Sequence, residues 1–264
     1  MPEPYIIAEI GSNLFKSADA DTNLEMGKSQ IAAAKDAGAD AVKFQLFTAA
    51  EIFGPAAEGT NWGAEVDKYA LPVSWLQPLK DHCDLIGIDF MCSAFSVAGY
   101  QTIEPMVSIH KIASPEVLHP DIGTYVAGTG KTFLWSDGCS TALTGQGVRM
   151  LCISKYPAMS EDYNLDEAPS SGDWGLSDHT KSTALAREAR QRGARYFEKH
   201  VDFFKHEGRH TPDTPVSADD RLFRAWVNVI RNESNPLRGK ACEKYGRQSK
   251  DGGWYRPVPE GSAD

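Results

Sequence analysis

The chain has 264 residues, of which 41% are hydrophobic and 24% are charged. This composition fits one large globular domain and excludes a disordered or fibrous chain. The net charge of −9, with no basic block, argues against binding of a nucleic acid through its phosphates. No apolar run approaches the roughly 20 residues of a membrane span, so we expect no membrane contact.

The cysteines and the first residues indicate the compartment. The chain has five cysteines, an odd number, and none forms a C-x-x-C pair. We therefore predict reduced thiols and no zinc ribbon. The opening sequence MPEPYIIAEIG has no basic leader before its short apolar run, so it does not resemble a signal peptide. Together these features predict a cytoplasmic protein.

Short apolar runs recur along the chain and predict eight β-strands. Most are continuously apolar rather than strictly alternating, as is typical of parallel strands that are covered on both sides. The predicted strands are residues 5–11, 41–47, 87–95, 107–114, 132–138, 148–154, 174–178 and 194–201.

Helical spacing appears between several of these runs. It predicts a helix over 21–37 and another over 180–192, the second capped by Thr180. Before the last apolar stripe, Ser217-x-x-Asp220 has the pattern of a capping box and predicts the start of a final helix. The alternation of strands and helices predicts one fold, a (β/α)₈ TIM barrel, with a doubly wound open sheet as the alternative.

Four segments depart from this regular order. Residues 139–147 and 157–173 are too short or too polar for full helices, and 48–71 form a long excursion after the second strand. Residues 234–264 show no periodicity and are rich in Gly, Pro and charge. We therefore place the barrel in residues 1–233 and expect an irregular C-terminal tail after it.

Polar residues gather at the carboxyl ends of the predicted strands, where barrel enzymes have their active sites. Lys43 lies inside VKFQ and Lys111 inside IHKIAS, each with apolar neighbours. A lysine inside a strand is costly to bury without an anionic partner. Two such lysines, together with several serine hydroxyls, predict a site for a phosphate and a carboxylate on one small molecule.

Two histidines end neighbouring predicted strands, His179 in GLSDHT and His200 in ARYFEKHV. They could be ordinary polar residues at the barrel rim, or they could face each other across a site. Two imidazoles would leave positions for a carboxylate, water and substrate, which suits a hard catalytic cation rather than structural zinc. Glu9 could either pair with one of the lysines or act in catalysis.

These segments resemble a known family, the sialic acid (N-acylneuraminate) synthases, together with the related pseudaminic and legionaminic acid synthases. The resemblance runs in the family's order over residues 5–217 and is carried by IAEIGSN, AGADAVKFQ, FMCSAF, KIASPE, LWSDG, LCISKYP, GLSDHT and GARYFEKHV.

The resemblance implies a metal-dependent condensation of phosphoenolpyruvate with an N-acylated amino sugar or a related aldose, with release of phosphate. His179 and His200 would ligate Mn²⁺ or Mg²⁺, and Glu9 would act on the water that completes the reaction. The residues implied for phosphoenolpyruvate are Lys43, Lys111, Ser93, Ser114, Ser136 and Ser177. Those implied near the sugar or the reacting carbons are Gln45, Tyr156 and Asp213, with Ser154 also assigned to substrate binding.

The sequence departs from the family pattern at identifiable positions. Asn13 is followed by Leu14 instead of His, and Ser154 replaces the usual Asn. Asp137 stands where threonine is common, and its charge would repel phosphoenolpyruvate unless it points away or binds metal. In the family a small antifreeze-like domain follows the barrel and supplies an arginine to a partner's site. We expect this chain to lack that domain, and we leave open whether the chain forms a homo-oligomer.

Two other functions remain open at this stage. The first is a 3-deoxy-sugar-acid phosphate synthase, which would need extra cations for a second phosphate; Lys155, Lys181, Lys205 and Arg209 are the candidates in the loops. The second is a degenerate barrel that binds a ligand without turnover.

Overall fold

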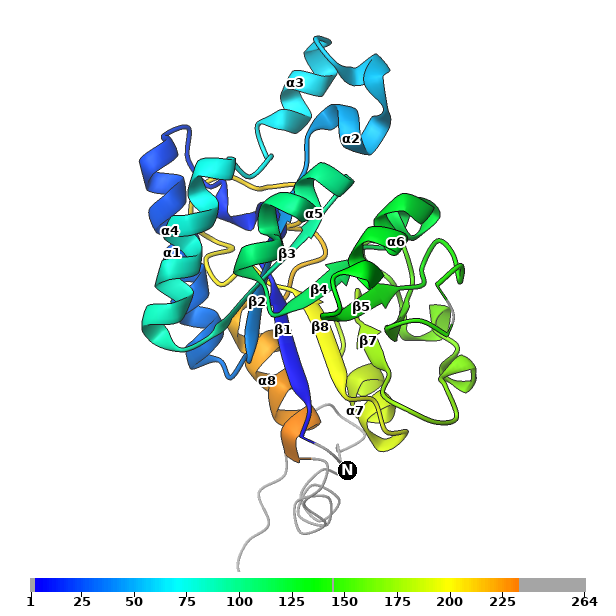
Figure 1. Ribbon diagram of the computed structural model, residues 1–264. Helices are drawn as coiled ribbons and strands as arrows, with labels where there is room; N and C mark the ends of the chain where they lie inside the picture. The colour runs from blue at the N-terminus through cyan, green and yellow to red at the C-terminus, as the bar shows by residue number, and fades with distance from the viewer. Residues whose placement is uncertain (1–2, 144, 233–264) are drawn as a thin grey trace, which may run out of the picture.

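The computed structural model describes residues 3–143 and 145–232, which fold into an eight-stranded parallel sheet wrapped by helices (Figure 1). The strands follow one another around the sheet in the order β3-β2-β1-β8-β7-β6-β5-β4, which is the order of a barrel and confirms the predicted fold. They are β1 (Tyr5–Glu9), β2 (Ala41–Leu46), β3 (Asp89–Ala94), β4 (Ile109–Ile112), β5 (Thr132–Ser136), β6 (Val148–Cys152), β7 (Gly175–Ser177) and β8 (Tyr196–His200).

The barrel has one seam. Among the described residues no backbone ladder joins β3 to β4, the two strands at the ends of the hydrogen-bonded order. Side chains cross this seam instead: Ser93 Oγ donates a hydrogen bond to the carbonyl oxygen of Lys111 at 3.0 Å, and the Tyr100 hydroxyl donates to the same oxygen at 2.7 Å. The barrel is therefore held closed there by two hydroxyl groups.

The helix layer is incomplete. The α-helices are α1 (Ala20–Asp36), α2 (Ala49–Phe53), α3 (Asn61–Asp67), α4 (Val73–Ile86), α5 (Val97–Ile103), α6 (Pro120–Gly128), α7 (Ala184–Gln191) and α8 (Asp220–Asn232). Between β6 and β7 the described chain forms only the short 3₁₀ turns η5 (Ser160–Asp162) and η6 (Leu165–Glu167), as the polar sequence of 157–173 predicts. None of the described helices is long and apolar enough to cross a membrane.

Both predicted helix caps are wrong. Helix α7 begins at Ala184, and the Thr180 hydroxyl contacts Ser182 in the preceding turn instead of capping the helix. At α8 the carboxylate of Asp219 accepts the amide hydrogen of Leu222. Ser217 is unavailable as a cap because its hydroxyl donates to the carbonyl of Asp213.

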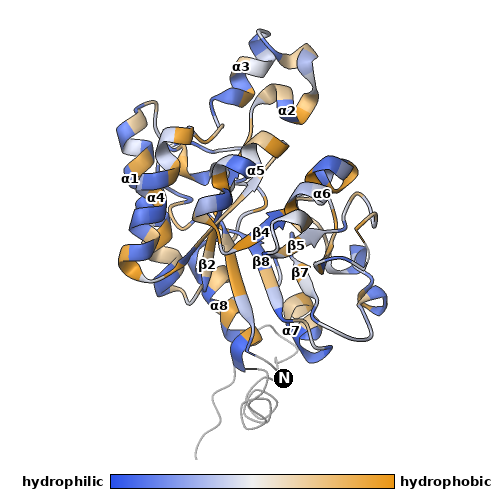
Figure 2. Cartoon of the chain, viewed as in Figure 1, coloured by the Kyte–Doolittle hydropathy of each residue, from blue (hydrophilic) through white to orange (hydrophobic). Residues whose placement is uncertain are grey.

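The strands separate two apolar clusters. The larger cluster lies between the sheet and the helices, which are striped in apolar and polar residues (Figure 2). The smaller cluster is formed by Ile7, Ala41, Met91, Leu134, Met150 and Tyr196. These residues alternate along their strands with the outward-facing ones, as Ile6 and Ala8 do around Ile7. The smaller cluster therefore fills the lower barrel interior, and the space above it is left to the next inward position of each strand.

The predicted tail, residues 234–264, lies outside the described residues, so its irregular character stays a prediction.

Candidate active site

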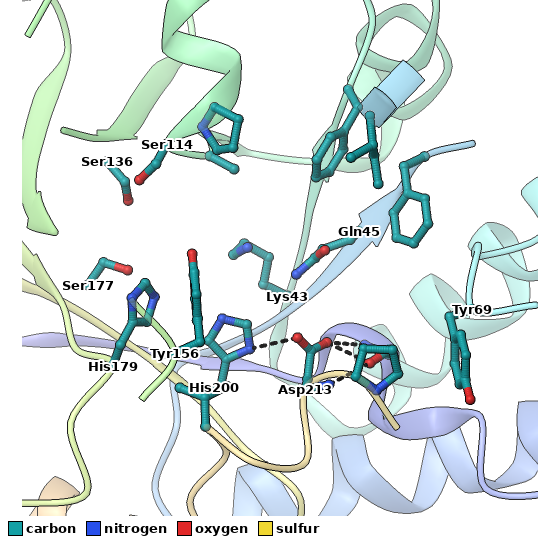
Figure 3. A pocket seen from close by; sticks show the side chains of 18 of the residues that line it. Lys43, Gln45, Tyr69, Ser114, Ser136, Tyr156, Ser177, His179, His200 and Asp213 are labelled. Atoms are coloured by element: carbon teal, nitrogen blue, oxygen red, sulfur yellow. Dashed lines mark hydrogen bonds and ion pairs between the residues drawn. The ribbon is translucent and has the colours of Figure 1, made fainter. Parts of the chain in front are cut away.

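A cavity of about 560 Å³ opens at the carboxyl ends of the strands, above the inner apolar cluster. Figure 3 shows residues from opposite sides of the barrel around this hollow. The predicted site residues that line it are Lys43, Gln45, Lys111, Ser114, Ser136, Tyr156, Ser177, His179, His200 and Asp213. Glu9 and Ser93 are buried just behind the wall of the cavity, in contact with Lys43.

The two strand lysines are both buried beside the cavity. Lys43 Nζ lies 2.5 Å from Glu9 Oε2 and 3.3 Å from Ser93 Oγ. Lys111 Nζ donates to Ser136 Oγ at 2.7 Å and to the carbonyl oxygen of Ile112 at 2.9 Å. Burial alone would lower the pKa of Lys43, but Glu198 and Glu9 outweigh it and raise the pKa above its ordinary value. Burial lowers the pKa of Lys111, against the opposing effect of Glu198.

Glu198 links the two lysines, and it was not among the predicted site residues. Its carboxylate oxygens lie 3.7 Å from Lys43 Nζ and 3.8 Å from Lys111 Nζ, and one of them accepts a hydrogen bond from Ser177. Burial would raise its pKa, but Lys111, Lys43 and the neighbouring histidines lower the pKa to about 2. Glu198 is therefore an anion at neutral pH. Its position two residues before His200 in EKH, on the same side of β8, was the signal that could have identified it.

Glu9 pairs with Lys43 on the side of the lysine that faces away from the cavity. Its carboxylate is fully buried, and its second oxygen accepts a hydrogen bond from Gln45 Nε2 at 2.8 Å. Burial raises the pKa of Glu9, while the charge of Lys43 opposes that shift. The geometry thus favours the pairing alternative for Glu9, because its two contacts hold both the lysine and the amide in place.

The two histidines face each other, with ring centroids 5.4 Å apart. His179 Nδ1 lies 2.6 Å from the carbonyl oxygen of Ile153, which can only accept, so Nδ1 carries the proton and Nε2 presents a lone pair. Burial, followed by the neighbouring His200, lowers the pKa of His179 to about 3, so the ring is neutral at neutral pH. The ring of Tyr156 packs on His179 with centroids 4.3 Å apart and fixes its orientation.

The donor chemistry of these side chains fits a divalent cation. A metal-ligating histidine usually donates its other ring hydrogen to a carbonyl or carboxylate, as His179 does. His200 Nδ1 is buried without a hydrogen bond among the described residues and lies 3.7 Å from Asp213 Oδ1. No three His, Cys, Asp or Glu side chains of the described chain are already gathered as a cation cage. The protein would thus contribute two imidazoles and leave the other positions open.

Asp213 reaches the cavity from the loop after β8. Its Oδ2 accepts hydrogen bonds from both the amide and the hydroxyl of Ser12, each at 2.7 Å, which leaves Oδ1 toward His200 (Figure 3). Gly11 makes this approach feasible: it has a φ of 53°, and a Cβ atom there would clash with the Asp213 carboxylate.

A second charged cluster braces the two histidines from outside the barrel. Lys199 Nζ lies 3.1 Å from Asp178 Oδ2 and donates to the carbonyl oxygen of Thr180 at 2.5 Å. The same Asp178 oxygen accepts from the indole nitrogen of Trp226 in α8 at 2.7 Å. Asp178 and Lys199 directly precede His179 and His200 in sequence, so this cluster, here called the outer brace, ties the two strand ends together.

Asp137, the unusual acid, points away from the cavity lining. Its Oδ2 receives Arg149 Nε at 2.7 Å and Nη2 at 2.6 Å, and its Oδ1 accepts the amide hydrogen of Cys152. It therefore clamps β5 to β6. Ser154 is exposed, contacts Cys139 Sγ at 3.3 Å and does not line the cavity. Its assignment to substrate binding stays a prediction.

Comparison with known proteins identifies the family. The family model described as the NeuB family matches residues 30–241. The spore coat polysaccharide biosynthesis protein SpsE of Bacillus subtilis is 32% identical over 89% of this chain and 71% of its own length. Pseudaminic acid synthase of Helicobacter pylori is 29% identical over 86% of this chain and 74% of its own length.

A solved structure supports the fold. The sialic acid synthetase of Leptospira borgpetersenii superposes with a TM-score of 0.76 and 23% identity, covering 93% of this chain and 92% of the other. The family match, which spans most of the barrel and includes every cavity lysine and histidine, supports the predicted resemblance. The chain belongs to the NeuB family of sugar-acid synthases.

Proposed function

We propose that this protein condenses phosphoenolpyruvate with an aldehyde-bearing amino sugar and releases inorganic phosphate. The observation that carries the proposal is the pair of buried lysines beside the cavity, each bonded to a serine hydroxyl. Such donors suit the phosphate and carboxylate of one small anion. The named pseudaminic and N,N′-diacetyllegionaminic acid synthases among its relatives support a sugar acid as the product.

In the proposed reaction, C3 of phosphoenolpyruvate bonds to the aldehyde carbon of the sugar. Water adds to C2, and the C2–O bond to phosphate breaks, which leaves a 2-keto acid and inorganic phosphate. Lys43 and Lys111 would hold the anion with hydroxyl donors from Ser114, Ser136 and Ser177. A divalent cation, Mn²⁺ or Mg²⁺, held by His179 and His200 would supply Lewis-acid polarisation of the aldehyde oxygen and offset negative charge.

The carboxylate best placed to act on the water is Glu198 rather than Glu9. Glu198 lines the cavity, whereas Glu9 does not. Glu9 is instead held by Lys43 and Gln45 behind the wall. A positioned carboxylate that orients the attacking water by accepting its hydrogen bond contributes roughly 10²–10⁴ in rate.

The cavity favours an acceptor without a phosphate group. Among the described residues, Lys43 and Lys111 are the only lysines or arginines that line it, and both lie at the end assigned to phosphoenolpyruvate. The loop cations considered for a second phosphate are engaged elsewhere or exposed. Lys155 pairs with Asp162, Lys205 donates to Ser217, Arg209 donates to Phe15, and Lys181 is exposed.

The test measures phosphate release from purified protein with phosphoenolpyruvate, Mn²⁺ and a panel of aldoses that includes N-acetylmannosamine. Release that requires the aldose is expected, and Lys111→Met should reduce kcat/KM by about 10²–10³ through loss of one anion donor. Lys155→Met is the matched control, since it removes a lysine of an exposed ion pair outside the cavity. Equal rates in both variants, or no aldose-dependent release by the unaltered protein, would contradict the proposal.

A further inference from the structure

The excursion between β2 and α4 forms a separate flap beside the cavity. It comprises residues 48–68, with α2, the 3₁₀ turn η2 (Pro55–Ala57) and α3. Figure 1 shows α2 and α3 rising above the ring of helices that surrounds the strands. Four flap residues, Ile52, Phe53, Glu65 and Val66, line the cavity.

Polar contacts at its base hold the flap in shape. The amide of Ala49 donates to Asp67 Oδ1 at 2.6 Å, which joins the two ends of the flap. Thr48 and Glu51 form a reciprocal capping box at the start of α2, and Ser96 Oγ donates to Glu51 Oε1 at 2.5 Å. The last contact anchors α2 to the loop after β3. The flap is therefore prearranged by its own caps and not by burial in the barrel core.

The flap exposes large apolar side chains. Phe53 is 56% exposed, Trp62 48% and Ile52 37%, and the rings of Phe53 and Trp62 meet edge to face at 5.2 Å. On the barrel wall, Phe47 and Phe95 form a second such ring pair at 5.6 Å, and both line the same cavity. Exposed apolar groups that gather at a cavity indicate a surface that a ligand covers.

This apolar surface lies away from the anion-binding end. In Figure 3, Ser114, Ser136 and Ser177 lie on one side of Lys43. Tyr69, which directly follows the flap in sequence and lines the same cavity, lies on the other side, beyond Gln45 and Asp213. The lining residues contributed by the flap include no lysine or arginine. Phosphoenolpyruvate would occupy the first side, so the second substrate meets the flap.

We propose that the flap selects the acceptor sugar by an apolar methyl substituent, which packs against Phe53 and Ile52 opposite Phe47 and Phe95. The inference rests on the proposed function, since it assigns part of the same cavity to the acceptor. A methyl group on the acceptor can come from an acyl group or from a deoxygenated ring carbon. Both sources share the chemistry that the flap recognises.

The size of the effect follows from the burial that the flap can provide. A methylene group in an enclosed apolar pocket changes kcat/KM by roughly 10–200-fold. The half-exposed flap should give a preference near the lower end, about tenfold. Because the flap lies away from the lysines and histidines, we expect the preference chiefly in KM, as for binding that is uniform along the reaction.

Two pairs of acceptors isolate the methyl group. N-acetylmannosamine is compared with N-formylmannosamine, and 6-deoxymannose with mannose, each with saturating phosphoenolpyruvate and Mn²⁺. The first pair tests an acyl methyl group and the second a ring methyl group. Phosphate release is measured for the unaltered protein, Phe53→Ala, Phe53→Leu and the control Leu85→Ala, which removes an 80% exposed leucine from α4 outside the cavity.

The expected result is a preference for the methyl-bearing member of at least one pair, which Phe53→Ala reduces toward one and Phe53→Leu largely restores. Leu85→Ala should leave the preference unchanged. A preference that survives Phe53→Ala intact, or no preference in either pair, overturns the inference while phosphate release still upholds the proposed function. Absence of phosphate release with every acceptor overturns the proposed function and the inference with it.

Discussion

Strand β8 carries buried charge to both of its faces, and the two clusters differ in how completely their hydrogen bonds are made. On the inner face, Glu198 and His200 each keep a buried polar atom without a hydrogen bond in the described chain. On the outer face, Lys199 and Asp178 are bonded to each other, to the Thr180 backbone and to Trp226. Buried polar groups are normally satisfied. The unmet atoms of Glu198 and His200 belong to side chains that line the cavity, where a ligand can complete them, and the outer brace is structural.

We expect the largest effect on activity from a substitution on the inner face of β8. Glu198→Gln keeps the size of the side chain but removes the charge that the two lysines face. We expect kcat/KM to fall by roughly 10²–10⁴ because the carboxylate no longer assists the attacking water. The variant should also lose some stability, because Lys111 loses its carboxylate partner, so turnover is measured well below the unfolding temperature of the variant. Wild-type turnover in Glu198→Gln would show that the carboxylate is not part of the chemistry.

A substitution in the outer brace should reduce the stability of the protein more than its turnover. Lys199→Met leaves Asp178 buried next to an apolar side chain, and breaking a buried pair by removing one partner costs about 3–5 kcal/mol of unfolding free energy. Urea titration measures this loss.

The double variant Lys199→Met/Asp178→Asn removes both charges together and should be destabilised by less than the sum of the two single variants. An additive double variant would mean that the two side chains stabilise the strand ends independently, and the brace would not be a unit.

Another buried acid, Glu116, belongs to neither cluster, and its titration gives a test through pH. Glu116 lies in the turn η4 (Pro115–Leu118), its Oε2 makes no hydrogen bond within the described residues, and burial raises its pKa from 4.5 to about 7. The folded state therefore holds a proton that the unfolded state releases at lower pH. Stability from this residue is full below pH 4.5 and declines as pH rises toward 7, by up to about 3 kcal/mol.

Glu116→Gln removes this titration. We expect the variant to gain stability relative to the unaltered protein at pH 7–8 and to match it near pH 4.5. Unfolding midpoints in urea across this range provide the measurement. A parallel decline in both proteins would place the titrating group elsewhere.

The sequence predicted the barrel and its chemical centre because these features depend on local pattern. All eight predicted strands are present, and Lys43, Lys111, His179 and His200 line one cavity as expected. What it could not supply was the direction of side chains. When both faces of a strand are buried, apolar periodicity does not show which residues turn inward, so Glu198 and Lys199 could not be told apart in role.

Loop structure was predictable only in part for a related reason. The excursion over 48–71 was found, but its two helices rest on caps at Thr48 and Thr60 within very short segments. Thr180 and Ser217 have cap-like sequences, yet tertiary contacts use their hydroxyls elsewhere. Asp137 was flagged as a repulsive charge, and only the fold shows that Arg149 neutralises it.

At the seam between β3 and β4, the Ser93 hydroxyl takes part in two hydrogen bonds. Its hydroxyl has a single proton, which now goes to the carbonyl oxygen of Lys111 and thereby helps to shut the cylinder. The same oxygen accepts a hydrogen bond from Lys43 Nζ at 3.3 Å, and the Tyr100 hydroxyl fastens the seam beside it. A lysine of the cavity wall and the closure of the barrel thus meet at one oxygen atom.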